Sequence, residues 1–199
     1  MKIGVLALQG DFSEHIAMLR CLGVETAEVR LPRHLADLDG LIIPGGESTT
    51  IGKLAVAYQL MSPLQEFGKT KAIWGTCAGA IFISKDAHRD QPLLGLMDIT
   101  VERNAFGRQV NSFETDLIVP VLPHAAKDSS TAGGAPVPYH AIFIRAPLIE
   151  SVYGGGEILA QLEDGRIVAA QQGRLLATVF HPELTRDTRF HEYFLTRCS

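Results

Sequence analysis

The sequence predicts an α/β fold of three layers, with a mostly parallel central sheet, helices on both of its faces and some antiparallel strands in the second half. In the first half, short apolar segments alternate with amphipathic ones, as buried parallel strands alternate with their covering helices. In the second half, apolar and polar residues alternate, and turn residues such as 163–166 join the segments. Because 199 residues suffice for one large core, we expect a single domain over residues 1–199.

The first half begins with an apolar strand at residues 2–8 and a turn at 9–11. A helix is expected from about 12 to 22, where Asp11 or Ser13 can cap its start and Gly23 ends it. The elements expected next are a strand at 24–30, a short segment at 32–38, a strand at 41–43, a helix from 48 towards 60, a helical piece at 63–67, a strand at 71–74 and a helix that starts near residue 80.

The second half contains shorter strands, predicted at 99–101, 115–119, 142–144, 158–162, 167–170 and 175–180. Between them, residues 120–138 are rich in Pro, Ala, Gly and Ser, which predicts a mobile surface loop. A final amphipathic helix is expected from about 186 to 195.

The composition argues against several classes of protein. A net charge of −4 without any Lys/Arg run offers no general attraction to nucleic acid or to an anionic membrane. No apolar run reaches the ~18 residues of a membrane span, and we expect no signal peptide because the first strand starts at once. Three widely spaced cysteines favour a reducing compartment, the cytoplasm by default, and argue against a zinc site.

Residues 46–54 superficially resemble a phosphate-binding loop. That motif needs glycine at position 47 and Ser or Thr at 54, where this chain has Glu47 and Leu54. An acidic side chain in the cradle would repel phosphate, and no dinucleotide fingerprint follows the first strand. We therefore expect neither a nucleotide cofactor nor a metal.

Residues 75–79 read Gly-Thr-Cys-Ala-Gly, a nucleophile flanked by glycines between a buried strand and a buried helix. Small residues are needed there because a side chain would clash in so sharp a turn. The turn would hold the Cys77 sulfur at the end of the sheet, over a helix N-terminus that favours a thiolate. The N–H of Ala78 would be free to meet an oxyanion. The alternative is a small buried cysteine at a tight packing position.

A matching base is predicted at the end of the last apolar strand, in Phe-His-Pro-Glu at 180–183. If the backbone stays extended, Glu183 points to the same side as His181 and can fix its tautomer, which leaves the other ring nitrogen for the thiol. A turn histidine with a solvated neighbour is the alternative. The two strand-end features together favour a Cys77–His181–Glu183 triad. We expect the remaining histidines, His15 and His191 among them, to be surface or satisfied residues.

With these features the chain resembles the class I (triad) glutamine amidotransferases, and among them the glutaminase subunits of pyridoxal phosphate synthase. The most specific matches are Pro-Gly-Gly-Glu-Ser-Thr at 44–49, Arg-Asn-Ala-Phe-Gly-Arg-Gln at 103–109 and Phe-Ile-Arg-Ala-Pro at 143–147. Further matches lie at 4–10, 14–15, 75–79, 112–114 and 181–184. The 120–138 loop is longer than expected for this family.

The resemblance implies one glutaminase domain that hydrolyses L-glutamine through a γ-glutamyl thioester on Cys77. It implies oxyanion contacts from the N–H groups of Gly46 and Ala78, and a docking face for a synthase partner that includes Gln9. The glutamine contacts that it implies are Gly46, Glu47, Ser48, Arg103, Ile144 and Arg145. An arginine suits the substrate carboxylate, and an acid suits its ammonium group.

Two alternatives remain open at this point. The chain resembles other class I glutaminases too, such as the one serving imidazole glycerol phosphate synthase, which share the triad and differ in the partner. A non-catalytic regulatory module of similar architecture, with an elbow-like cysteine, is the second alternative.

Overall fold

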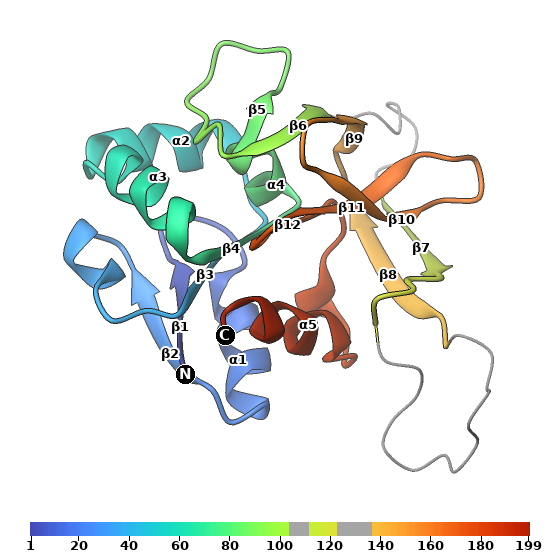
Figure 1. Ribbon diagram of the computed structural model, residues 1–199, viewed down its shortest axis with the longest axis horizontal. Coiled ribbons are helices and arrows are strands. Elements are labelled where there is room, and N and C mark those ends of the chain that lie inside the picture. The colour runs from blue at the N-terminus through green and yellow to red at the C-terminus, as the bar shows by residue number, and fades with distance from the viewer. Residues whose placement is uncertain (104–111, 123–136) are drawn as a thin grey trace.

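A ten-stranded sheet lies at the centre of the molecule in the computed structural model, which describes residues 1–103, 112–122 and 137–199 (Figure 1). Its strand order is β2-β1-β3-β4-β12-β11-β9-β6-β5, with β10 paired to β11. The bounds are β1 Lys2–Leu6, β2 Glu25–Val29, β3 Gly40–Ile43, β4 Ala72–Thr76, β5 Ser84–Asp86, β6 Met97–Glu102, β9 Leu148–Val152, β10 Glu157–Gln161, β11 Ile167–Gln172 and β12 Leu175–Thr178. A separate antiparallel pair joins β7 (Ser112–Leu117) to β8 (Tyr139–Ile144).

Parallel and antiparallel strands are divided between the two halves as predicted. Strands β2, β1, β3, β4 and β12 are mutually parallel. Strand β11 runs antiparallel to β9, β10 and β12, and β6 runs antiparallel to β9. The predicted turn at 163–166 joins β10 to β11. The three-layer, mostly parallel α/β prediction is confirmed.

Helices cover both faces of the sheet (Figure 1). One face carries α1 (Phe12–Cys21) and α5 (Arg189–Arg197), and the other carries α2 (Ser48–Ala57), α3 (Met61–Thr70) and α4 (Ala78–Ile83). Two 3₁₀ helices, η1 (Pro32–Leu35) and η2 (Pro182–Leu184), complete the described helical elements.

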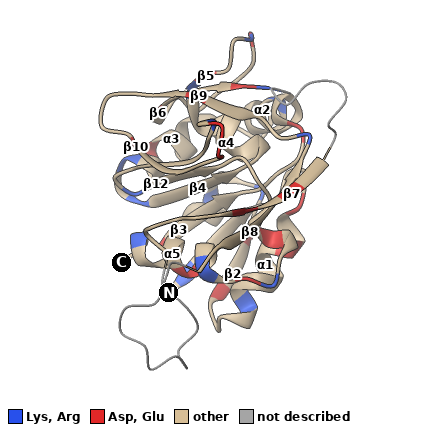
Figure 2. Ribbon diagram, turned by 90° about the vertical axis from the view of Figure 1, so that its right-hand side faces the viewer, with Lys and Arg blue, Asp and Glu red and all other residues tan. Residues whose placement is uncertain are grey.

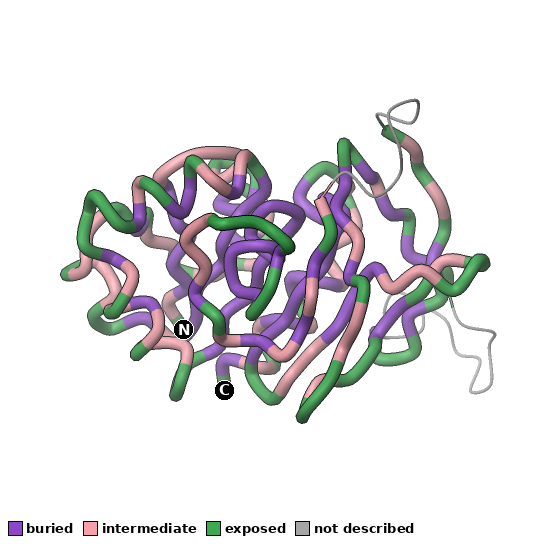
Figure 3. The backbone as a smooth tube through the Cα atoms, turned by 90° about the horizontal axis from the view of Figure 1, so that it is seen from above, coloured by how far each residue is buried: buried purple, intermediate pink, exposed green. Residues whose placement is uncertain are grey.

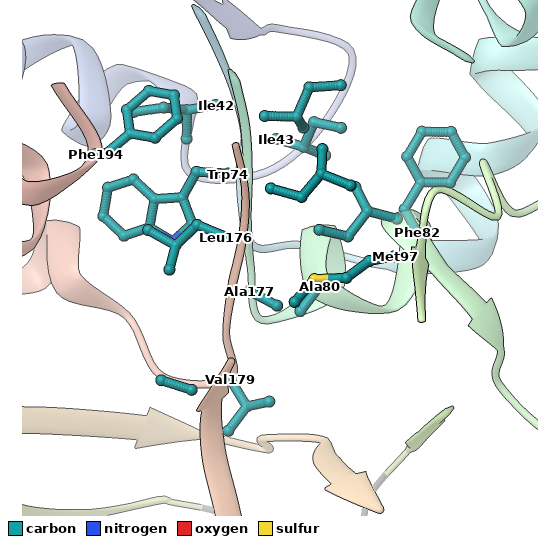
Figure 4. Packing of buried hydrophobic residues seen from close by; sticks show 14 of the residues in the cluster. Ile42, Ile43, Trp74, Ala80, Phe82, Met97, Leu176, Ala177, Val179 and Phe194 are labelled. Atoms are coloured by element: carbon teal, nitrogen blue, oxygen red, sulfur yellow. The ribbon is translucent and has the colours of Figure 1, made fainter. Parts of the chain in front are cut away.

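The core is divided by the sheet into two apolar layers (Figure 4). Trp74 packs towards Phe194 of α5 on one side, with ring centroids 5.6 Å apart, and Phe82 lies on the other side. The inner strands β3, β4 and β12 are buried along their whole length, whereas exposed residues gather at the periphery (Figure 3). Such strands read as continuous apolar runs in the sequence because both of their faces are covered.

Several boundaries differ from the prediction. Strands β5 and β9 were not anticipated, since β5 is a short run of polar residues and β9 mixes polar with apolar ones. Helix α3 extends well beyond the expected 63–67, and β7 begins three residues before the expected 115. Residues 123–136 of the predicted 120–138 loop lie outside the described residues.

Positively and negatively charged residues are both scattered along the ribbon (Figure 2). Among the described helices, none has both the length and the apolar character needed to cross a membrane.

Candidate active site

Cys77 occupies the predicted elbow between β4, which ends at Thr76, and α4, which begins at Ala78. Its backbone has φ 47° and ψ −104°, a sparsely populated conformation for a residue with a side chain. The glycines around it allow the close packing that this turn requires. A Cβ at Gly79 would lie 2.0 Å from the carbonyl oxygen of Ile43 on β3, and one at Gly75 would lie 2.4 Å from the carbonyl oxygen of Gly79.

His181 follows β12, the parallel neighbour of β4, and its backbone N–H donates to the carbonyl of Ile142 over 2.8 Å. Its Nδ1 donates to Oε1 of Glu183 over 2.7 Å, as predicted. The backbone reason differs from the prediction, because Glu183 lies in the 3₁₀ helix η2 rather than in an extended segment. Gly45 leaves room for the imidazole, since a Cβ there would come within 2.6 Å of the ring.

The electrostatics of His181 favour its charged form. Burial alone would lower the pKa of the ring, but hydrogen bonds and charge from Cys77 and Glu183 outweigh burial and raise that pKa to about 10. Burial raises the pKa of the Glu183 carboxyl, and its hydrogen bond from His181 opposes that rise. The structure therefore brings together a thiol, an imidazole that contacts it, and a carboxylate behind the imidazole.

Cys77 and His181 open into a pocket of about 450 Å³ at the carboxyl ends of the parallel strands. Every residue that the resemblance assigned to glutamine, to the oxyanion or to the partner lines this pocket. They are Gln9, Gly46, Glu47, Ser48, Ala78, Arg103, Ile144 and Arg145. Residues 104–109 of the arginine motif lie outside the described residues, so Arg103 alone represents it here.

Glu47 and Arg103 supply opposite charges on one wall of the pocket. Glu47 caps α2 by accepting from the N–H groups of Thr49 and Thr50, and these hydrogen bonds, against the opposing effect of burial, lower the pKa of its carboxyl to about 2. Its Oε1 lies 2.9 Å from a guanidinium nitrogen of Arg103. The backbone N–H of Glu47 donates to Oε1 of Gln9 over 2.7 Å, so Gln9 also holds the glycine loop in place.

The capping prediction for α1 needs correction. Asp11 stands at the N-cap position, yet neither its side chain nor that of Ser13 makes a capping hydrogen bond. The Asp11 carboxylate lies instead 3.7 Å from Nδ1 of His181.

Two histidines expected to be ordinary surface or satisfied residues lie behind the triad. His15 and His191 are both fully buried, and Nε2 of His15 lies 3.3 Å from Oε2 of Glu183. The burial of His15 could have been predicted from the sequence, because His15 precedes Leu19 by one helical turn and both lie on the buried face of α1. For Gln91, which accepts from the Ser48, Thr49 and Arg103 side chains, we find no such signal.

Donor atoms of Asp11, His181 and Glu183 lie within 4.8 Å of one another, a spacing seen in metal sites. In this structure Nδ1 of His181 carries a proton and donates it to Glu183, so this nitrogen has no lone pair with which to bind a metal. We therefore interpret the cluster as part of the triad.

A parallel α/β sheet with a cysteine elbow, a histidine at the next strand and a carboxylate beside it is the arrangement of the triad glutamine amidotransferases. A model described as the SNO glutamine amidotransferase family matches residues 5–199. The chain belongs to this family.

Individual relatives are similar to this chain over nearly its whole length. The pyridoxal 5'-phosphate synthase subunit PdxT of Herpetosiphon aurantiacus is 58% identical over 200 residues, covering 98% of this chain and 99% of the relative. The PdxT subunit of Chloroflexus aggregans is 52% identical over the same shares. A solved structure of a glutamine amidotransferase is 47% identical, with a TM-score of 0.88 and 98% of each chain covered. PurLQS from Thermotoga maritima, 18% identical with a TM-score of 0.70 over 100% of this chain and 98% of that one, shares the fold.

Proposed function

We propose that this chain is the glutaminase subunit of a pyridoxal phosphate synthase. It hydrolyses L-glutamine to glutamate and ammonia as one domain over residues 1–199, and passes the ammonia to the synthase partner. The main support for this proposal is the position of His181 between the thiol of Cys77 and the carboxylate of Glu183. Cys77 and His181 line a pocket that also holds the opposite charges of Glu47 and Arg103. The PdxT relatives favour this branch over the glutaminase of imidazole glycerol phosphate synthase.

In the proposed first step His181 takes the thiol proton of Cys77 on its Nε2, and the resulting thiolate attacks the side-chain amide carbon of glutamine. The amide oxygen becomes an oxyanion, for which the N–H groups of Ala78 and Gly46 are the proposed donors; losing one such donor costs on the order of 3 kcal/mol. His181 then donates its Nε2 proton to the departing nitrogen as the C–N bond breaks, which leaves a γ-glutamyl thioester and ammonia.

In the second step His181 acts as a base on water, which attacks the thioester and releases glutamate with the thiolate restored. Glu183 keeps the proton on Nδ1 throughout, so that Nε2 faces the reaction. Arg103 suits the α-carboxylate of glutamine, and Glu47, ionised at neutral pH, suits its α-ammonium group. Ser48, Ile144 and Arg145 form the rest of the proposed substrate contacts.

Delivery of ammonia supplies the reason for a partner. Ammonia released into water at neutral pH is mostly protonated and loses its nucleophilicity, so a closed route to the synthase is needed. Ile144 and Leu184 line the pocket and are 37% and 41% exposed, an apolar rim that a docked subunit would cover. We propose Gln9 as part of this docking face, and a cytoplasmic location, which the free thiols of Cys21, Cys77 and Cys198 support.

The test is glutamine hydrolysis by the wild type and by Cys77→Ala, each with and without the purified synthase subunit from the same organism. We expect turnover that rises on docking and is abolished by Cys77→Ala, with Cys21→Ala, an exposed cysteine, as the matched control that retains it. A glutamine-mimicking electrophile should label Cys77 alone. Equal hydrolysis by wild type and Cys77→Ala would contradict the assignment, and labelling of no cysteine would favour the regulatory module.

A further inference from the structure

One oxygen of the Glu183 carboxylate takes no part in the hydrogen bond to His181. Oε1 accepts from His181, whereas Oε2 is buried and makes no well-aligned hydrogen bond among the described residues. Nε2 of His15 lies 3.3 Å from Oε2 and 3.2 Å from the hydroxyl oxygen of Thr76, the residue before Cys77. His15 is thus the group within reach of both the carboxylate and the nucleophile's strand.

A second buried histidine stands behind the first. Nδ1 of His15 and Nε2 of His191 are 3.0 Å apart, and Nδ1 of His191 has no partner among the described residues. The edges of both rings pack against Trp74, at centroid distances of 5.7 and 5.0 Å, which fixes their orientation. The order of contacts is His191, His15, Glu183, His181 and Cys77, running from α5 to the elbow.

Two physical arguments select the tautomers. If His15 carried its proton on Nδ1, the lone pair on its Nε2 would face the carboxylate oxygen at 3.3 Å, which is repulsive. His191 would then need its own proton on Nδ1, where a buried N–H would lack an acceptor, a rarer and costlier defect than an unused lone pair. The opposite assignment avoids both: His191 donates from Nε2 to Nδ1 of His15, and His15 presents Nε2–H to Glu183 and Thr76.

Both rings act as neutral donors rather than as cations. Burial, together with the charges of His191 and His181, holds the pKa of His15 well below its usual range. Burial also lowers the pKa of His191, to about 4. The contact between His15 and Glu183 is therefore a neutral N–H facing a carboxylate, not an ion pair.

We propose that His15 is a positioning residue for the triad, which steadies the ionised Glu183 through its second oxygen, and that His191 fixes the tautomer of His15. The inference rests on the proposed glutaminase function. The titratable groups that act on Glu183 are His181 on its own segment, His15 on α1, Asp11 at the start of α1 and, through charge, Tyr139 on β8. His15 does not line the substrate pocket, so its effect should appear in kcat and not in KM.

The test compares His15→Leu with His15→Gln in the complex with the synthase subunit, counting active sites by titration with a glutamine-mimicking electrophile. His15→Leu should lower kcat per titrated site about 10- to 100-fold, the usual cost of leaving a buried charged acceptor without the N–H that faces it, with KM for glutamine unchanged. His15→Gln should recover most of that loss, because its amide nitrogen can take the place of Nε2. The acidic limb of the pH profile should move to higher pH in His15→Leu, since the charged form of Glu183 loses a donor.

A merely structural role would lower the melting temperature and the number of titratable sites of both variants, with kcat per site and the pH profile unchanged; that result overturns the proposal. If His15→Leu does not fold, His191→Leu against His191→Gln tests the same relay from its far end, where we expect only the Leu variant to lose kcat per site. Equal kcat in those two variants would also overturn it. Failure of the proposed function itself is distinguished by the wild type, which would then show no Cys77-dependent hydrolysis.

Discussion

Gly79→Ala tests the elbow that holds the nucleophile. Gly79 lies in α4, two residues after Cys77, and a Cβ there would stand 2.0 Å from the carbonyl oxygen and 2.8 Å from the carbonyl carbon of Ile43. Both are backbone atoms, so no side chain can rotate away, and α4 and β3 must separate by at least 1 Å to reach an acceptable contact. Overpacking of this kind costs about 1–3 kcal/mol, which for a chain of this size lowers Tm by roughly 2–12 °C.

The same displacement moves the sulfur. A shift of about 1 Å in a reacting group costs on the order of 100-fold in rate, so we expect kcat for glutamine hydrolysis to fall by that factor. Differential scanning calorimetry and the hydrolysis assay measure the two effects. Gly155→Ala is the matched control, because its Cβ would meet nothing closer than 3.8 Å.

The sign of the change in Tm distinguishes a crowded elbow from an uncrowded one. In a helix free of clashes, Gly→Ala stabilises by up to about 1 kcal/mol, so an uncrowded elbow would raise Tm. A Gly79→Ala variant with an unchanged or higher Tm and full activity would refute the packing argument.

Three further predictions concern the charges of the site. Glu183→Gln should keep the fold and lower kcat by about 10²–10⁴, because the His181 tautomer is no longer enforced; steady-state kinetics check this, and an unchanged kcat would count against the triad. The His181 ring should titrate near pH 10 when followed by NMR. Because its pKa is raised above the unfolded value of 6.5, the stability that its charged form contributes is complete below pH 6.5 and is lost as the pH rises through about 10. A titration midpoint near 6.5 would contradict this. Arg103→Ala should raise KM for glutamine about tenfold or more, as expected for a lost charged contact, while Arg103→Lys loses less; equal KM values would remove Arg103 from the substrate site.

Much of the fold was predictable because its central strands are covered on both faces. Strands such as β3 and β4 then appear as continuous apolar runs, and the parallel arrangement follows from their alternation with helices. Strand β9 (Leu148–Val152) escaped prediction since it contains Glu150 and Ser151 and is only partly buried.

The triad was predictable because each member follows a strand, and strand ends meet at one edge of the sheet. The surroundings were not, because they depend on contacts between distant segments. His15 reaches Glu183 across 168 positions only after α1 and η2 pack together, and the Arg103 ion pair with Glu47 joins β6 to the start of α2 in the same way. Composition and local spacing do not predict such contacts between distant segments.

The central claim is that Cys77 carries the substrate during turnover. Acid quenching of the complex during glutamine hydrolysis, followed by peptide mass spectrometry, measures this directly. We expect the peptide containing Cys77 to carry a γ-glutamyl group in the wild type and no cysteine peptide to carry it in Cys77→Ala. Active turnover with an unmodified Cys77 peptide, or with the group on another residue, would contradict the account.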